Sequence, residues 1–231
     1  MDLTFSTPSV PVIPVAGSQD FFPVHRIYCV GRNYAEHSKE MGGTGREAPF
    51  FFMKPADAVL PVAPGTLGQM PYPSKTNNLH HEVELVVAIG KAGSDISVEE
   101  AGQYIWGYAV GLDMTRRDLQ AESKQQGRPW CTAKGFDYSA PISAIYAATG
   151  LQNIESAEIK LTVNGSSRQQ SEINKMTWNV HEIIAQLSQF YALQPGDLIF
   201  TGTPEGVGAV QRGDILDAAI EGLGNLRVEI I

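Results

Sequence analysis

Two glutamates separated by one residue stand out in the stretch His81-Glu82-Val83-Glu84-Leu85, which continues into an apolar run typical of a β-strand. Side chains at positions i and i+2 of a strand project from the same face, so Glu82 and Glu84 are expected to point the same way. Neighbouring carboxylates repel and are costly to bury, and a divalent cation that prefers oxygen ligands compensates them. The pair therefore indicates a metal site, although the same pattern alone also fits two solvent-facing glutamates on a strand edge.

A third carboxylate follows further along the chain. Asp113 ends an apolar stretch and directly precedes a predicted helix, so it can complete the metal site or take part in capping that helix. Arg117 and Gln120 are three residues apart on the helix and share a face. They can contact a bound anion or a developing oxyanion, or they can form a solvated helix face.

A histidine and a glutamate share a face of another predicted helix, residues 34–41. His37 and Glu40 are three residues apart there, and a carboxylate behind an imidazole fixes its tautomer and stabilises the imidazolium. This arrangement is typical of a general base. The spacing alone also fits a surface histidine near an acid.

Two more positions have residue types suited to substrate binding. Lys134 stands among apolar residues, where it is either a functional ammonium or a side chain that extends its end to water. The glycine-rich segment Thr201–Gly208 includes Thr203 and can direct backbone N–H groups and hydroxyls at a carboxylate. It can equally be a tight turn between strands.

Composition limits the class of protein. The chain has 231 residues, 43% hydrophobic and 18% charged, which fits one globular domain with a sizeable core. A net charge of −8 argues against nucleic acid or an anionic membrane as the main partner. The two cysteines, Cys29 and Cys131, form no Cys-x-x-Cys motif, and we find no signal peptide or membrane-spanning run. These features predict a cytoplasmic protein.

The elements that must position these residues are mainly strands. The hydrophobic pattern predicts an extended, proline-punctuated arm over residues 1–25 and a single domain over residues 26–231, which contains all the candidate catalytic residues. Asn164-Gly165 is a strong hairpin signal. Strands are expected at residues 27–30, 50–53, 82–89, 105–112, 142–147 and 159–163 and twice within 214–231. Helices are expected at 34–41, after Ser97, at 115–126 with Thr115 as N-cap, and at 178–193. The expected fold class is therefore α+β, dominated by strands.

Several short motifs occur in one characteristic order. They are Gly31-Arg32-Asn33-Tyr34-Ala35-Glu36-His37, Phe52-Met53-Lys54-Pro55, His81-Glu82-Val83-Glu84, Gly111-Leu112-Asp113-Met114-Thr115, Ala133-Lys134-Gly135-Phe136, Gly196-Asp197 and Thr201-Gly202-Thr203-Pro204-Glu205-Gly206-Val207-Gly208. In this order the chain resembles the fumarylacetoacetate hydrolase family over about residues 25–231. Within the family it looks most like the single-domain fumarylpyruvate and acylpyruvate hydrolases.

The resemblance implies a metal centre and a water-activating pair. Glu82, Glu84 and Asp113 fall on the family's ligand motifs, which implies Mg²⁺, with Mn²⁺ or Ca²⁺ as substitutes. His37 and Glu40 fall on the dyad that activates water. Larger members have an extra N-terminal domain and a further upstream aspartate ligand that has no clear counterpart here, so water is expected to complete the coordination.

The resemblance also implies the remaining contacts and the assembly. Lys134, Arg117, Gln120 and Thr203 are expected to contact the substrate and its oxyanion. The implied fold is a mixed β-roll with short flanking helices, like the C-terminal domain of fumarylacetoacetase, and members usually form homodimers. The expected partner is a small anionic dioxo acid, with no nucleic acid or membrane.

The implied reaction is cleavage of a C–C bond in a 2,4-dioxo acid, giving pyruvate and a carboxylate such as fumarate, as in aromatic catabolism. Alternatives within the family are decarboxylation of oxaloacetate and isomerisation or decarboxylation of dioxo-dienoates. A non-catalytic metal-binding protein is a further alternative, which needs neither the His37/Glu40 pair nor Lys134. Arg32 and Arg46 are candidates to bind a distal carboxylate of the substrate.

Overall fold

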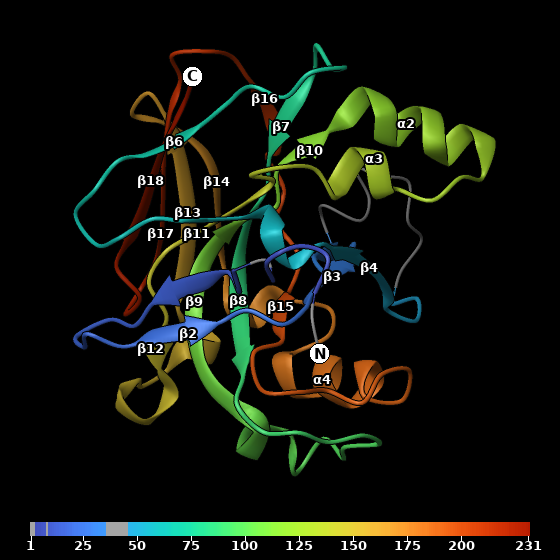
Figure 1. Cartoon of the computed structure of the whole chain (residues 1–231), viewed down its shortest axis with the longest axis vertical. Coiled ribbons are helices and arrows are strands. Elements are labelled where there is room, and N and C mark those ends of the chain that lie inside the picture. The colour runs from blue at the N-terminus through green and yellow to red at the C-terminus, as the bar shows by residue number, and fades with distance from the viewer. Residues whose placement is uncertain (1–2, 8, 36–45) are drawn as a thin grey trace.

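The computed structural model describes residues 3–7, 9–35 and 46–231 and consists mainly of two β-sheets that pack against each other, with short helices around them (Figure 1). The strands of the larger sheet are β3 (Ile27–Gly31), β4 (Phe50–Lys54), β5 (Val59–Pro61), β8 (Val83–Ile89), β9 (Ile105–Leu112), β11 (Ala140–Ile142), β12 (Tyr146–Ala147) and β15 (Leu198–Phe200). Their order is β4-β3-β15-β8-β9-β11-β5, with β12 beside β9. The sheet is mixed, because β15 runs parallel to β3 and β11 parallel to β5 while the other pairs are antiparallel.

The remaining strands form a second large sheet and two small ones. The second large sheet has the order β14-β13-β17-β18-β6. Its strands are β6 (Gly68–Met70), β13 (Glu158–Val163), β14 (Ser166–Glu172), β17 (Ile215–Ile220) and β18 (Asn225–Ile230). A three-stranded sheet contains β7 (Leu79–His81), β10 (Thr115–Arg116) and β16 (Gly208–Val210), and a hairpin contains β1 (Val12–Pro14) and β2 (Phe21–Pro23).

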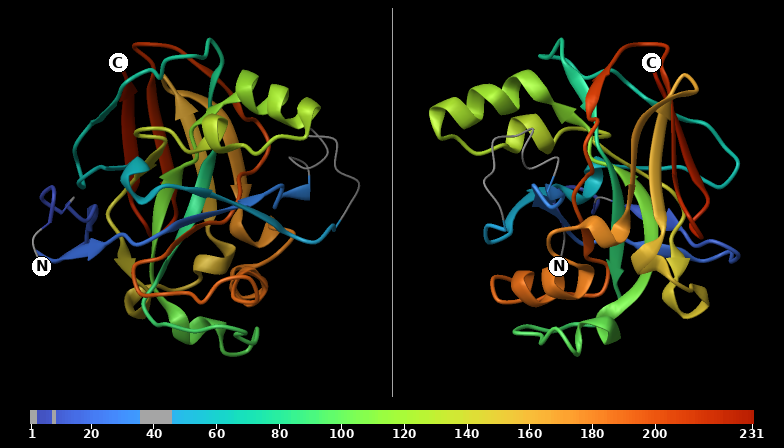
Figure 2. Two further views of the ribbon diagram at one scale, coloured as in Figure 1. Left: turned by 45° about the vertical axis from the view of Figure 1, so that its right-hand side comes forward. Right: turned by 180° about the vertical axis from the view of Figure 1, so that it is seen from behind.

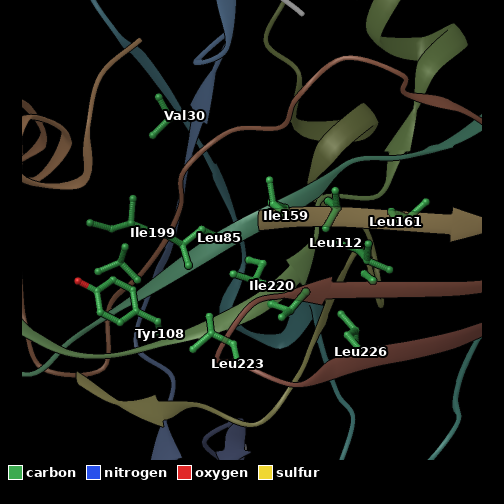
Figure 3. Packing of buried hydrophobic residues seen from close by; sticks show 14 of the residues in the cluster. Val30, Leu85, Tyr108, Leu112, Ile159, Leu161, Ile199, Ile220, Leu223 and Leu226 are labelled. Atoms are coloured by element: carbon green, nitrogen blue, oxygen red, sulfur yellow. The ribbon is translucent and has the colours of Figure 1, made fainter. Parts of the chain in front are cut away.

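The main hydrophobic core lies between the two large sheets, as Figure 3 shows. Leu85 from β8 and Leu112 from β9 belong to the same buried cluster as Ile159 and Leu161 from β13. Burial of these side chains contributes on the order of 25 cal/mol per Å² of apolar surface removed from water. The core therefore fixes the strands on which the acidic residues stand.

Strand β8 is buried on both faces. Leu85 and Val87 face the main core, whereas Val86 and Ala88 belong to a second cluster on the opposite face of the sheet. This explains the unbroken apolar run that follows the glutamates, because a strand covered on both sides has no exposed face for polar residues. Glu84 has the same parity as Val86, so its side chain lies on the second face.

The second face is covered partly by the β1–β2 hairpin. Ile13 and Phe22 are buried and pack in the same cluster as Val86 and Ala88. The hairpin falls within residues 1–25, which the sequence predicted to be an extended arm. The segment therefore has β-structure of its own and contacts the body of the protein.

The predicted hairpin at Asn164-Gly165 is confirmed. β13 and β14 pair in antiparallel fashion around these two residues. Asn164 has φ 51° and Gly165 has φ 78°. Two consecutive residues with positive φ match a two-residue turn of the I′ type, for which Asn-Gly is the favoured pair.

The described helices are α2 (Arg117–Gln126), α3 (Cys131–Lys134) and α4 (Val180–Leu187). The prediction that Thr115 caps α2 is wrong, since Thr115 is buried and lies in β10, paired with His80. The residue that precedes the helix is Arg116, whose side chain makes no capping hydrogen bond. Thr115 and Arg116 form a separate two-residue strand because β7 offers backbone partners there, which sequence alone does not reveal.

Helix α4 is shorter than predicted. It begins with a capping box, in which the Asn179 side chain accepts from the Glu182 amide and the Glu182 side chain accepts from the Asn179 amide. It ends at Leu187, and Phe190 is 69% exposed instead of continuing the buried face. The α-helical period beyond Leu187 is therefore coincidental, and the chain turns before it reaches Gly196.

Two other predictions need correction. The expected strand over residues 142–147 is two short strands, β11 and β12, separated by three residues. The helix expected after Ser97 is a single 3₁₀ turn, Ala101–Tyr104, although the Ser97 hydroxyl does accept from the Glu100 amide at 3.3 Å. Short local signals fixed the position of these elements but not their length.

The views in Figure 2 show α2 and α3 together on one side of the sheets, whereas α4 lies beside another part of the sheets. Cys29 is buried, Cys131 is exposed, and both are free thiols. None of the helices in the described ranges has the length and apolar character needed to cross a membrane. The strand-dominated α+β architecture confirms the expected mixed β-roll with short flanking helices.

Candidate metal and substrate site

Three carboxylates converge at the point where β7, β8 and β9 meet. Glu82 lies between β7 and β8, Glu84 lies in β8, and Asp113 directly follows β9. One carboxylate oxygen from each lies within 4.8 Å of the others, and all three residues are buried. The β8–β9 register explains this, because the Asp113 amide donates to the Glu82 carbonyl at 2.9 Å and places the two residues opposite each other.

Three cationic side chains surround these acids. Lys134 Nζ donates to Glu82 Oε2 at 2.7 Å and to Asp113 Oδ2 at 2.6 Å. Lys54 Nζ forms an ion pair with Asp113 Oδ1 at 2.8 Å, and Arg117 Nη2 donates to Glu82 Oε1. Removing one partner from a buried ionic cluster leaves an uncompensated charge, so each cation here balances the charge of the Glu82 or Asp113 carboxylate that it contacts.

Lys54 is a site residue that the sequence analysis did not assign. It is 1% exposed, and its ammonium also donates to the carbonyl oxygens of Met114 and Lys134. The available signal was its place in the Phe52-Met53-Lys54-Pro55 motif after an apolar strand. Its partner Asp113 is distant in sequence, so spacing alone could not connect them.

Glu84 is held by the loop that follows β15. The Gly202 amide donates to Glu84 Oε2 at 2.8 Å. Gly202 has φ 99°, and an added Cβ would lie 2.7 Å from the Cβ of Asn33, so only glycine fits there without strain. Burial raises the pKa of Glu84 well above its usual value, and the neighbouring carboxylates of Asp113 and Glu82 raise it further.

The electrostatic environment keeps Lys134 protonated. Burial lowers the pKa of its ammonium, but Asp113 and Glu82 together outweigh burial and raise the pKa above its ordinary value. An ammonium has three N–H donors, and the two carboxylates take two of them. Lys134 therefore combines a fixed positive charge with one further donor.

The acidic cluster lines a small cavity of about 20 Å³. Arg117 Nη1 donates to Gln120 Oε1 at 2.5 Å, and this couples the two side chains that the helical spacing placed on one face. The cavity is lined by Val30, Gly31, Arg32, Phe50, Phe52, Glu82, Glu84, Asp113, Arg117, Gln120, Trp130, Lys134 and Thr203. Acidic, cationic and aromatic side chains thus line the same space.

A comparison with known proteins places this arrangement in a family. The family model described as fumarylacetoacetate (FAA) hydrolase C-terminal matches residues 26–231. The chain belongs to the fumarylacetoacetate hydrolase family. A solved structure of fumarylpyruvate hydrolase from Pseudomonas aeruginosa, in complex with Mn²⁺ and pyruvate, is 53% identical, with a TM-score of 0.98 and coverage of 100% of this chain and 99% of that chain.

Relatives with different names share the sequence pattern. A fumarylpyruvate hydrolase from Ralstonia sp is 45% identical over 184 residues, which are 80% of this chain and 93% of that protein. A mitochondrial oxaloacetate tautomerase from Rattus norvegicus is 42% identical over 204 residues, which are 88% of this chain and 90% of that protein. The fumarylacetoacetate hydrolase family therefore includes similar chains with more than one named activity.

Thr203 lies in the cavity wall, but its hydroxyl is already engaged. Its Oγ1 donates to the Val83 carbonyl at 2.8 Å and accepts from Gln169 Nε2 at 2.8 Å. A hydroxyl has only one hydrogen, so this group has no second donor for an anionic ligand. Gln169, which the sequence patterns did not indicate, also accepts through Oε1 from the Val83 amide and from His81 Nδ1, so it links this loop to β8.

The structure therefore brings seven of the nine predicted site residues around one cavity of the fumarylacetoacetate hydrolase fold. They are Glu82, Glu84, Asp113, Arg117, Gln120, Lys134 and Thr203. His37 and Glu40, the predicted water-activating pair, lie outside the described residues. The roles of all nine remain predictions.

Proposed function

We propose that this protein is a divalent-metal-dependent hydrolase that cleaves the C–C bond of a 2,4-dioxo acid. The substrate is fumarylpyruvate or another acylpyruvate, and the products are pyruvate and a carboxylate such as fumarate. The observation that carries the proposal is the buried cluster of Glu82, Glu84 and Asp113 with its cations. It receives support from the 53% identical fumarylpyruvate hydrolase whose structure holds Mn²⁺ and pyruvate.

The donor set fits a divalent cation. Glu82, Glu84 and Asp113 offer hard carboxylate oxygens within 4.8 Å of one another, which suits Mg²⁺ or Mn²⁺. When bound, the ion would stabilise the negative charge that develops on the pyruvate part of the substrate. We propose Mg²⁺ as the usual ion, with Mn²⁺ or Ca²⁺ as substitutes.

Side chains of this protein transfer the proton and stabilise the negative charge that develops on the substrate. His37, oriented by Glu40, removes a proton from water as the water attacks the C4 carbonyl. Arg117, Gln120 and the remaining donor of Lys134 stabilise the oxyanion that forms there. The C3–C4 bond then breaks, its electron pair goes to the pyruvate enolate, and His37 returns a proton.

The test measures turnover of fumarylpyruvate, acetylpyruvate and oxaloacetate, with and without Mg²⁺. The loss of the substrate's enol absorbance reports turnover. We expect metal-dependent hydrolysis of the acylpyruvates, abolished in Glu82→Ala and in His37→Ala. No turnover of any dioxo acid would favour a non-catalytic metal-binding protein. If His37→Ala retained fumarylpyruvate cleavage while Glu82→Ala lost it, the water-activating role of His37 would be wrong.

A second candidate activity is chemistry on oxaloacetate, supported by the 42% identical oxaloacetate tautomerase. Decarboxylation of oxaloacetate produces the same pyruvate enolate and needs no attacking water. Isomerisation of dioxo-dienoates is a further alternative within the family. Metal-dependent turnover of oxaloacetate that survives His37→Ala, without acylpyruvate hydrolysis, would establish this reading instead.

We also propose the wider setting of the enzyme. Residues 26–231 act as one catalytic domain, preceded by the segment 1–25. The protein works as a homodimer in the cytoplasm, in the breakdown of aromatic compounds, and has no nucleic acid or membrane partner. Size measurement in solution and the fraction in which the activity is found check the assembly and the location.

A further inference from the structure

One cation that lines the cavity has no close anionic partner among residues 3–7, 9–35 and 46–231. Arg32 lines it together with Glu82, Asp113 and Arg117. Within the described part of the chain, the buried Nε of Arg32 has no hydrogen-bond partner. Among the described residues its one ion pair is long, 3.9 Å from Nη1 to Glu47 Oε2, and the Glu47 side chain is 56% exposed.

The other two cations of this cavity differ from Arg32 in this respect. Arg117 donates directly to Glu82, and Lys134 lies 2.6–2.7 Å from carboxylate oxygens of Asp113 and Glu82. A buried N–H without an acceptor costs free energy unless a ligand satisfies it. The guanidinium of Arg32 is therefore available to an anion that enters the cavity.

The backbone around Arg32 is firmly positioned. Arg32 has φ 58°, a left-handed conformation that is uncommon for a residue other than glycine. It is held by Asn33, whose side-chain amide donates to the carbonyls of Trp178 and Thr201 and accepts from the Trp178 amide. A strained residue that its neighbours hold in place indicates a functional constraint at that position.

The surroundings of Arg32 match the outer part of an acyl chain. Phe50, Phe52 and Trp130 line the same cavity, with Phe50 and Trp130 rings 5.2 Å apart. The Arg32 guanidinium carbon lies 5.9 Å from the centroid of the Phe50 ring. The acidic cluster, aromatic rings and a cation therefore line one cavity, which are the chemical groups that an unsaturated chain with a distal carboxylate would need.

From this geometry we infer that Arg32 binds the carboxylate at the far end of a dicarboxylic substrate. A planar guanidinium binds a carboxylate through two parallel hydrogen bonds, which gives both affinity and orientation. Arg32 thereby makes the site prefer a fumaryl chain over an uncharged acyl chain. The inference rests on the proposed function, whose substrate class it narrows.

Arg46, the other arginine named from the sequence, is already engaged. Its Nη2 lies 2.6 Å from Glu182 Oε1, and its guanidinium carbon lies 4.3 Å from the centroid of the Trp178 ring. It is absent from the lining of the cavity that holds the acidic cluster. Arg46 therefore serves as the competing candidate in the test.

The test compares kcat/KM for fumarylpyruvate and acetylpyruvate in Arg32→Gln, Arg32→Lys and wild-type enzyme with Mg²⁺. Loss of a charged hydrogen bond predicts a decrease of about 10- to 150-fold for fumarylpyruvate in Arg32→Gln. We expect a change below about 2-fold for acetylpyruvate, which has no distal carboxylate, and partial recovery in Arg32→Lys. Arg32→Asn, a residue type that tolerates positive φ, replaces the glutamine variant if that variant does not fold.

A matched control is Arg212→Gln, because Arg212 is exposed and stacks on Tyr72 away from the cavity lining. It should leave both substrates unaffected. Equal losses on the two substrates in Arg32→Gln, or selective loss in Arg46→Gln instead, overturn the role of Arg32 alone. A wild-type protein that hydrolyses neither substrate overturns the proposed function, and this inference with it.

Discussion

Replacing Lys134 by methionine should make the folded state depend on a divalent cation. The ammonium donates to Glu82 Oε2 and Asp113 Oδ2, and all three residues are buried. Methionine has a similar length but no charge, so the variant leaves the acids without one of their cations. Breaking a buried ionic pair by removing one partner costs about 3–5 kcal/mol, which is the expected loss in the free energy of unfolding without metal.

Added metal should restore part of this loss. A ligand that binds only the folded state contributes about 2.7 kcal/mol when its concentration is one hundred times its Kd. Without Lys134 the cluster has one more uncompensated negative charge, so it should bind the cation more tightly than in the wild type. The metal-induced stabilisation should therefore be larger in Lys134→Met than in the wild type.

The measurement is urea unfolding of both proteins at one protein concentration, in EDTA and then in Mn²⁺. The matched control is Lys160→Met, because Lys160 pairs with Glu158 at 2.8 Å but is about half exposed. This control should unfold close to the wild type in both buffers. Equal unfolding free energies of wild type and Lys134→Met in EDTA, or a smaller metal effect in the variant, would refute the reasoning.

Three further predictions concern acid sensitivity, metal affinity and metal removal. Burial, and then Arg117, lower the pKa of His80 from its ordinary value of 6.5 to about 4. Between these two pH values the unfolded chain binds this proton and the folded protein does not, so stability is lost as the pH falls from 6.5 to about 4. Thermal unfolding of His80→Gln should show a shallower loss of stability over that pH window. Gly202→Ala should displace Glu84 and thereby weaken Mn²⁺ binding, which calorimetry measures. The control Gly213→Ala, at a position with φ 90° and open space around it, should leave Mn²⁺ binding unchanged. Equal effects of the two substitutions would contradict the steric argument. Dialysis against EDTA should abolish acylpyruvate turnover and added Mg²⁺ or Mn²⁺ should restore it, while full activity after chelation would contradict a metal-dependent mechanism.

Local patterns predicted the acidic cluster well. The i, i+2 spacing of Glu82 and Glu84 needs only the strand period, and Asp113 follows because β8 and β9 are adjacent in the chain and pair directly. The Asn164-Gly165 hairpin was predictable for the same reason, since its geometry depends on two residues. When paired strands are close in sequence, few alternative strand pairings are possible, so the residues that face each other can be predicted.

Contacts between distant segments could not be predicted in this way. Lys54 reaches Asp113 across 59 positions of numbering, and Gln169 reaches His81 across 88. The first contact depends on the strand order within the larger sheet, which contains both β4 and β9, and the second on how β14 packs against β7; no local period encodes either arrangement. The early end of α4 at Leu187 has a related cause, because the helical period continues to Phe190 although tertiary contacts no longer support it.

The charge balance of the buried cluster has a thermodynamic consequence. With all groups ionised, three acids face three cations, and the six residues are Glu82, Glu84, Asp113, Lys54, Lys134 and Arg117. A divalent ion would displace the proton that the raised pKa of Glu84 favours and would add two positive charges to formal charges that already cancel, so it binds best together with a dianion. Ion and substrate must then strengthen each other's affinity by the same factor, as linkage requires. The resting protein would hold its ion loosely, and the substrate would complete the centre.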